Sequence, residues 1–251
     1  MTFVLAEFCS MEEYAEGICL LSCIAIRKEP NSASEMTSQL LFGEVFLVVG
    51  QEEGWTRIMC DYDGYEGWIS AAQLSYLKPD SFWAKFDYRV QTEFLLPTDS
   101  GGQTIQTMMG SNVRRNGHQP TMQPKPENLL ATAKCYLNSP YQWGGRSLFG
   151  IDCSGFMQVV FKICGVKLLR DAYQQASQGS EVASLDDAMI GDLSFFENDK
   201  NRITHVGMML GPGQIIHASG KVKIETIDSE GIYSREQMRH THKLHSIRRI
   251  I

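Results

Sequence analysis

The first third of the chain has the hydrophobic pattern of short β-strands. Strand-like runs lie at Ile18–Arg27, Val45–Gly50, Trp55–Cys60 and Gly67–Ser70, and apolar residues alternate with other residues in the first of them. Turn-forming residues separate the runs, and the two runs that flank the Asp61–Gly64 turn should pair as a hairpin. Short strands joined by tight turns predict a small all-β barrel.

The pattern becomes irregular in the middle of the chain. Phe86–Leu96 has the composition of a strand, and Gly101-Gly102 marks a break after it. Three prolines in the segment from Asn116 to Pro126 predict a linker. This region fits either a truncated second barrel or a decorated connector.

A helical period begins near residue 127. Glu127–Leu137 predicts an amphipathic helix whose apolar face extends to Leu137, and a second helix should run from Cys153 to Gly165. Strands follow at Ile203–Leu210 and Ile215–Ala218, joined by a glycine-rich turn. Helices followed by strands predict an α+β domain. The domains expected from these patterns are residues 1–77, 78–124 and 125–251.

Composition and charge are those of a soluble globular protein. Of the 251 residues, 43% are hydrophobic and 21% charged, and the net charge of −6 argues against nucleic acid as the main partner. No stretch approaches the roughly 20 apolar residues of a membrane span. Acidic residues near the N-terminus argue against a signal peptide, and the lipoprotein-like run Leu20–Cys23 fits a buried strand better. We therefore expect a cytoplasmic location, or a periplasmic one if a signal peptide has been removed.

The seven cysteines form neither a metal-binding pattern nor a disulfide framework. Their spacing is irregular, and no CxxC pair is present. We expect most of them, including Cys135 and Cys164, to be free and buried in a protein from a reducing compartment. The sequence predicts no cofactor and no metal, and we expect a monomer.

Cys153 differs from the other cysteines in its surroundings. It follows the glycine-rich run YQWGG at Tyr141–Gly145 and opens the second predicted helix in the run DCSG. Backbone N–H groups and the helix dipole favour a thiolate at a helix N-terminus, and a thiolate can attack a carbonyl carbon. Taken alone, position 153 fits a buried structural cysteine better, but the glycine-rich approach and the histidines downstream favour a nucleophile.

Two histidines are placed to act as a base and as the group that orients it. His205 starts one predicted strand and His217 lies on the next, so a tight hairpin should place them on neighbouring strands. Two satisfied core histidines are the simpler alternative, and a zinc site lacks a convincing fourth ligand. His240, His242 and His245 fit a solvated strand or terminal segment better than a metal site.

Together these motifs resemble the catalytic domain of the NlpC-type cell-wall cysteine peptidases, which have a papain-like fold. The resemblance covers residues 125–251 and implies Cys153 as nucleophile, His205 as base and His217 as the third, orienting residue. It also implies substrates with a γ-D-glutamyl bond to a diamino acid, as in peptidoglycan stem peptides. The matching runs are Pro140–Gly145, Asp152–Gly155, Arg170-Asp171, Gly191–Leu193, Thr204–Gly207 and Ile216–Ala218.

The N-terminal pattern resembles a bacterial SH3-type domain at Arg27–Pro30, Gln39–Glu44 and Gly64–Trp68. Such a barrel followed by an NlpC-type domain is similar to a subgroup of γ-D-glutamyl-L-diamino-acid endopeptidases that act on short, trimmed peptides. In this subgroup the barrel walls one end of the cleft. Acidic and aromatic groups of the barrel there recognise the free amine of an N-terminal L-alanine.

That likeness implies substrate-binding roles for several residues. Tyr65 matches the aromatic group, Glu35 is the candidate for the acidic one, and Asp152 is placed to meet the same amine. A paired carboxylate offsets the cost of desolvating an ammonium group. Tyr141 should hydrogen-bond near the sulfur, and Ser154 should help hold the D-glutamate carboxylate.

The Arg170-Asp171 motif adds a further candidate and one departure from the family. Asp171 is expected to contribute to substrate binding. Related sequences often carry a hydroxyl residue directly after this motif, where the present chain has Ala172. A hydrogen bond to the substrate is therefore missing or supplied elsewhere.

The leading hypothesis is a cysteine peptidase that cuts L-Ala-γ-D-Glu from a diamino acid. One alternative is a wall-binding protein whose barrel does the work and whose catalytic domain is vestigial, although an intact triad argues against it. Another is a thiol-dependent amidase or acyltransferase on the same fold, because the acyl-enzyme chemistry is shared.

Overall fold

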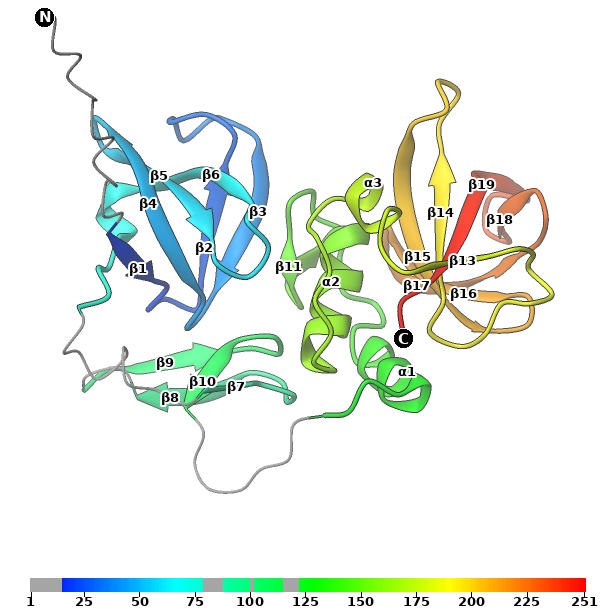
Figure 1. Cartoon of the computed structure of the whole chain (residues 1–251), viewed down its shortest axis with the longest axis horizontal. Helices are drawn as coiled ribbons and strands as arrows, with labels where there is room; N and C mark the ends of the chain where they lie inside the picture. The colour runs from blue at the N-terminus through cyan, green and yellow to red at the C-terminus, as the bar shows by residue number, and fades with distance from the viewer. Residues whose placement is uncertain (1–14, 79–87, 100–101, 115–121) are drawn as a thin grey trace, which may run out of the picture.

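A computed structural model of the chain describes residues 15–78, 88–99, 102–114 and 122–251. The N-terminal strands form a sheet on the left of Figure 1, helix α2 (Cys153–Ile163) lies near the centre, and a C-terminal barrel lies on the right. Short strands of the middle region lie below the N-terminal sheet in this view. The architecture is α+β, as predicted.

The N-terminal part forms one six-stranded antiparallel sheet in the order β1-β4-β5-β6-β2-β3. Its core contains Ile24, Leu40 and Ile58. The predicted hairpin is confirmed, because β5 pairs with β6 across the Asp61–Gly64 turn, where Gly64 has a φ of 72° that favours glycine. The elements are β1 (Glu16–Ile18), β2 (Cys23–Arg27), β3 (Met36–Leu41), β4 (Val45–Glu52), β5 (Trp55–Cys60), β6 (Glu66–Ser70) and the 3₁₀ helix η1 (Ala71–Gln73).

Two features of this sheet differ from the prediction. The run Ile18–Arg27 is not one strand, because the chain bends at Leu21 and Ser22, between β1 and β2. Strand β3 was not predicted, since the polar residues Ser38 and Gln39 hide its alternation. Both are buried because they bond to arginines of the C-terminal part.

The middle region forms two separate two-stranded ladders in its described residues. The strand predicted at Phe86–Leu96 is therefore only partly present, and residues 86–87 lie outside the described residues, as do residues 116–121 of the predicted linker. Met108 and Met109 pack into the core of the C-terminal part. The ladders are β7 (Tyr88–Val90) with β10 (Asn112–Arg114) and β8 (Leu96–Asp99) with β9 (Thr104–Thr107).

The C-terminal part consists of helix α2 packed against a closed β-barrel. Six strands close the barrel in the order β14-β15-β16-β17-β18-β19, with β19 returning to β14, and β13 pairs with β19. Helix α2 is buried along its whole length and lies against β15 and β16. The elements are α1 (Pro126–Lys134), β11 (Arg146–Ser147), β12 (Gly150–Ile151), α3 (Ala172–Gln175), β13 (Ser180–Val182), β14 (Leu193–Glu197), β15 (Ile203–Gly211), β16 (Gln214–Ser219), β17 (Lys221–Ile227), β18 (Gly231–Ser234) and β19 (Arg239–Arg249).

Both predicted helices and both predicted C-terminal strands are present, with two corrections at α1. The helix ends at Lys134, and Leu137 is 38% exposed instead of extending the apolar face. Cys135, at the C-cap of α1, is exposed, whereas Cys164 is buried as predicted. The buried surface of this segment continues through Tyr136 instead.

A buried charge network joins the three parts of the chain. Glu44 accepts hydrogen bonds from the Arg146 guanidinium at 2.8 and 2.9 Å and from Lys162 Nζ at 2.6 Å. Lys162 also donates to the carbonyl oxygen of Gly110 at 2.8 Å. Burial alone raises the pKa of Glu44, but the two cations bring it to about 2. The carboxylate therefore stays ionised at neutral pH, and the buried cations depend on it.

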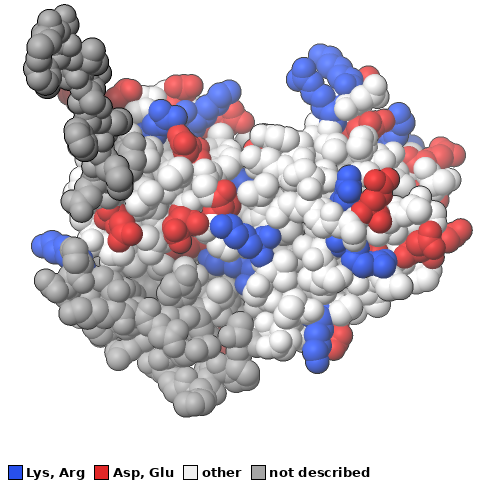
Figure 2. Space-filling view, in the orientation of Figure 1, with Lys and Arg blue, Asp and Glu red and all other residues white. Residues whose placement is uncertain are grey.

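The surface carries charges of both signs. Acidic and basic side chains are interspersed on the face shown in Figure 2. Within the described part of the chain, no helix combines the length and the hydropathy needed to cross a membrane.

Candidate active site

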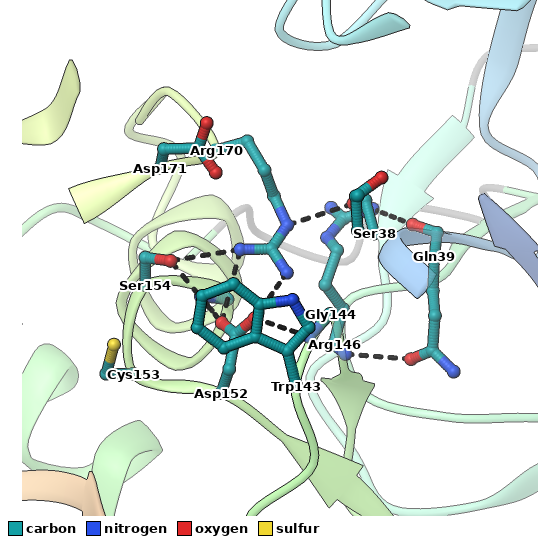
Figure 3. Close-up of polar contacts among 12 residues, drawn as sticks. Ser38, Gln39, Trp143, Gly144, Arg146, Asp152, Cys153, Ser154, Arg170 and Asp171 are labelled. Carbon is teal, nitrogen blue, oxygen red and sulfur yellow. Dashed lines mark hydrogen bonds and ion pairs between the residues drawn. The ribbon is translucent and has the colours of Figure 1, made fainter. Parts of the chain in front are cut away.

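Cys153 lies at the first position of α2, where the sequence predicts a helix N-terminus. Asp152 caps this helix, and its Oδ1 accepts from the N–H of Gly155 at 2.6 Å. The same carboxylate forms an ion pair with Arg170 at 2.6 Å and accepts from the N–H of Gly144 at 2.8 Å (Figure 3). Asp152 thus fixes the first turn of α2 and the loop before it. The helix start and the loop together position the thiol of Cys153.

The glycines of YQWGG let the loop before Cys153 lie against the N-terminal sheet. Gly144 has a φ of 76°, and an added Cβ atom would lie 2.3 Å from the carbonyl oxygen of Met36 on β3. Two residues later, the N–H of Arg146 donates to the Gln39 side chain at 2.8 Å (Figure 3). Strand β3 and this loop therefore pack directly against each other.

His205 on β15 and His217 on β16 lie side by side. His205 Nε2 and His217 Nδ1 are 2.8 Å apart, and His217 Nε2 lies 2.9 Å from Glu225 Oε2 on β17. The Cys153 sulfur lies 4.0 Å from the carbonyl oxygen of Thr204, the residue before His205. The structure thus brings the three predicted catalytic residues together at the junction of α2 and the barrel.

His242 on β19 adds a third imidazole to this group. The sequence predicts a solvated strand here, but the His242 ring stacks on His205 with centroids 4.1 Å apart and 28° between the planes. Nitrogens of His205, His217 and His242 lie within 4.8 Å of one another. A metal ion binds an imidazole nitrogen in the plane of its ring, and two nearly parallel stacked rings do not converge on one point. This arrangement does not fit a tetrahedral zinc site.

Burial sets the protonation of the resting site. It raises the pKa of the Cys153 thiol to about 12, with a further contribution from the charge of Asp152. Burial also lowers the pKa of His205 well below its ordinary value, and His242 and His217 add to that effect. The site at rest holds a thiol beside a neutral imidazole. The expectation that the helix N-terminus favours a thiolate is thus outweighed by burial, and a thiolate requires a base to take the proton.

A cavity of about 590 Å³ opens beside Cys153, between the N-terminal sheet and the C-terminal part. Glu35 and Tyr65 line it from the N-terminal side, and Trp143 lines it from the loop before the cysteine. The indole N–H of Trp143 donates to Glu35 at 2.7 Å, so the two sides are in direct contact. Other lining residues include Lys28, Asp152, Ser154, Arg170, Asp171 and Ala172.

The cavity contains five of the six predicted substrate-binding residues; Tyr141 is not among its lining residues. Burial and the neighbouring Cys153 raise the pKa of Tyr141, which is consistent with a position near the sulfur. Ser154 Oγ accepts from Arg170 at 3.0 Å and lies 3.4 Å from Asp152 Oδ1. Asp171 is half-buried, and burial raises the pKa of its carboxyl group.

Sequence reasoning missed Glu225 and the packing of His242. Glu225 pairs across the ladder with Ile215, two residues from His217, and therefore projects to the same face of the sheet as that histidine. The predicted hairpin involves only the two histidine strands. Glu225 lies on the next strand, β17, and finding it from the sequence would have required the register in which β17 pairs with β16.

Thermal stability should fall as the pH is lowered from 7. Burial lowers the pKa of both His205 and His217 in the folded protein, so below about pH 6.5 the unfolded chain binds more protons than the folded one. Glu44 has a pKa of about 2 in the folded protein, so stability should fall further as the pH drops below 4.5, the ordinary pKa of a glutamate. Thermal denaturation between pH 8 and pH 3 measures this. A Tm that stays constant down to pH 4 would contradict the assignment.

Comparison with known sequences gives two family matches. The NlpC/P60 family matches residues 138–242, and the bacterial dipeptidyl-peptidase SH3 domain matches residues 26–74. A Bacillus subtilis (strain 168) protein named gamma-D-glutamyl-L-lysine dipeptidyl-peptidase is 36% identical, over 79% of this chain and 78% of that protein. A protein of the same name from Bacillus cereus (strain ATCC 10987 / NRS 248) is 27% identical, over 80% of this chain and 73% of that protein.

Solved structures show the same architecture. The crystal structure of an NlpC/P60 family protein from Bacillus cereus ATCC 10987 has a TM-score of 0.79 and covers 94% of this chain and 99% of its own, at 19% identity. Sequence and fold together place the chain among the cysteine peptidases. Within that class, it belongs to the NlpC/P60 family and carries an N-terminal bacterial SH3 domain.

Proposed function

We propose that this protein hydrolyses the γ-D-glutamyl bond to a diamino acid in short peptidoglycan-derived peptides that have a free N-terminal L-alanine. The observation that carries this proposal is the single cavity on which Glu35 and Tyr65 lie together with Cys153. The name shared by the two Bacillus relatives supports the γ-D-glutamyl bond as the bond that is cut, and L-lysine as the diamino acid that is released. Because those relatives are named as peptidases, a binding protein without activity is not favoured.

The chemistry uses the thiol and the two histidines. His205 takes the thiol proton while the sulfur of Cys153 attacks the γ-carbonyl carbon of D-glutamate, and N–H groups at the start of α2 stabilise the oxyanion. The C–N bond breaks, and His205 returns its proton to the departing amine. Water, deprotonated by His205, then hydrolyses the thioester and releases L-Ala-γ-D-Glu. His217 orients the His205 ring through their 2.8 Å hydrogen bond.

Recognition of the free amine is assigned to Glu35 and Asp171, beside Tyr65. Both carboxylates line the cavity, whereas both oxygens of Asp152 already accept hydrogen bonds from Arg170 and from backbone N–H groups. An ammonium group is costly to desolvate without a carboxylate partner, so this pair selects a free N-terminus. Asp152 then has a structural role, because its carboxylate bonds to Arg170 and to backbone N–H groups. Ser154 remains the candidate for binding the D-glutamate carboxylate.

N-acetylation of the substrate should lower kcat/KM by about tenfold to a hundredfold, because the acetyl group removes the positive charge that Glu35 and Asp171 bind. The rates of lysine release from L-Ala-γ-D-Glu-L-Lys and from its N-acetyl derivative measure this. Equal rates for the two peptides would rule out amine recognition.

Two variants refine that comparison. Glu35→Gln keeps an acceptor for the Trp143 N–H but loses the charge, so the preference for the free amine should shrink. Glu29→Gln removes an exposed carboxylate that is not among the cavity-lining residues and should leave the preference unchanged.

We further propose that the protein acts as a cytoplasmic monomer on released wall peptides. The six cysteines in the described residues are all free, and four of them are buried, as suits a reducing compartment. Light scattering after size exclusion should give a mass near 28.3 kDa. A mass twice that value would contradict the monomer.

A further inference from the structure

Glu225 is an acidic residue close to the active site that the reaction described above does not use. Its Oε2 lies 2.9 Å from His217 Nε2, its Oε1 lies 3.1 Å from Lys223 Nζ, and its side chain is 8% exposed. Burial raises the pKa of Glu225, but hydrogen bonds from His217, Ser234 and Lys223 bring it to about 2. The carboxylate is therefore ionised at neutral pH and can only accept hydrogen bonds.

An ionised Glu225 fixes the protons on the neighbouring imidazoles. His217 Nε2 must carry a hydrogen in order to donate to the carboxylate, so a neutral His217 has a bare Nδ1. That bare nitrogen accepts from His205 Nε2 at 2.8 Å. A neutral His205 with a hydrogen on Nε2 has its free lone pair on Nδ1.

We propose that Glu225 is a positioning residue that holds His205, through His217, in the tautomer whose Nδ1 receives the thiol proton of Cys153. This inference rests on the proposed role of His205 as the base. One proton moves from sulfur to Nδ1, and no other reactant takes part. The resulting imidazolium donates from Nε2 to His217, so its positive charge lies close to the carboxylate in a buried site and is stabilised there.

The other groups around this chain of hydrogen bonds have distinct effects. Lys223, on the same strand as Glu225, partly offsets the charge of the carboxylate. His242 packs on His205 from β19, and burial together with His217 lowers its pKa to about 4, so it is neutral at pH 7. Asp152 acts on the thiol from the start of α2. Among the described residues, Glu225 is the anion that bonds directly to His217, and His217 links it to His205.

The tautomers can be read in the unmodified protein. Long-range ¹H–¹⁵N spectra of protein labelled with ¹⁵N-histidine separate protonated ring nitrogens from bare ones. At pH 7 we expect a protonated Nε2 and a bare Nδ1 on both His205 and His217, with assignments from His205→Gln and His217→Gln. A protonated Nδ1 on His205 in the resting protein would overturn the proposal.

A variant tests the effect of the charge. Glu225→Gln keeps the shape of the side chain, and we expect alkylation of Cys153 by iodoacetamide at pH 7 to slow about tenfold, because fewer molecules hold the thiolate–imidazolium pair. The pH of half-maximal alkylation should rise, and kcat should fall with KM unchanged. Peptide mass spectrometry reads the modification at Cys153 separately from that at the exposed Cys135.

Glu236→Gln is the matched control, because it removes an exposed carboxylate from the turn between β18 and β19. It should leave the alkylation rate and its pH profile unchanged. An unchanged rate and profile in Glu225→Gln would also overturn the proposal. Neither the spectra nor the alkylation needs a substrate. If the wild type shows the expected tautomers but does not cleave the tripeptide, the proposed function fails and the role of Glu225 in proton placement stands.

Discussion

Cys153→Ala should abolish the release of lysine from L-Ala-γ-D-Glu-L-Lys, lowering kcat by about 10⁴-fold or more. The sulfur forms the acyl-enzyme, and alanine offers no atom that can replace it. The side chain is small and 5% exposed, and the helix cap at Asp152 does not depend on it, so the fold should be retained. Lysine release followed by chromatography gives the rate, and the Tm reports the fold.

Cys135→Ala is the matched control for this experiment. It also removes a free thiol, but from the exposed end of α1, and it should leave kcat unchanged. Activity in Cys153→Ala comparable to that of the wild type would mean that another group attacks the bond.

Glu44→Gln should lower the free energy of unfolding by about 3–5 kcal/mol. The substitution leaves the buried side chains of Arg146 and Lys162 without their anion, while the low pKa of Glu44 shows that the pairing is strong in the folded protein. Because the network joins the N-terminal sheet to the C-terminal part, the KM for the tripeptide should rise as well. Urea denaturation and Tm measure the stability.

Glu66→Gln provides the comparison for a surface ion pair. Glu66 lies 2.7 Å from Arg57, and about half of each side chain is exposed, so its loss should cost less than about 1 kcal/mol. Equal stability losses in the Glu44 and Glu66 variants would show that the buried network contributes no more than a surface pair.

The parts of this structure that could be predicted from the sequence are local. The period of α2 and the turn at Asp61–Gly64 lie within a few residues, and the structure confirms both. The placement of Cys153 at the start of a helix needs only that helix, and the placement of the two histidines on adjacent strands needs only one hairpin. In the structure the sulfur of Cys153 lies beside the backbone of Thr204, next to His205, and His205 bonds to His217.

The rest depends on contacts between distant segments. Glu44 and Arg146 are 102 residues apart in sequence, and neither has a neighbour that signals the ion pair. Asp152 was predicted to meet the substrate amine, but Arg170, 18 residues later, occupies its carboxylate. Glu225 reaches His217 only through the register of a third strand. Pairing of this kind is set by tertiary packing, which periodicity does not encode.

The most direct test of the central claim is mass spectrometry of the products from L-Ala-γ-D-Glu-L-Lys incubated with the wild-type protein in H₂¹⁸O. Hydrolysis of the γ-D-glutamyl bond predicts free L-lysine without label and L-Ala-γ-D-Glu with one ¹⁸O atom in its γ-carboxylate. An intact peptide, or release of L-alanine in place of L-lysine, would contradict the account.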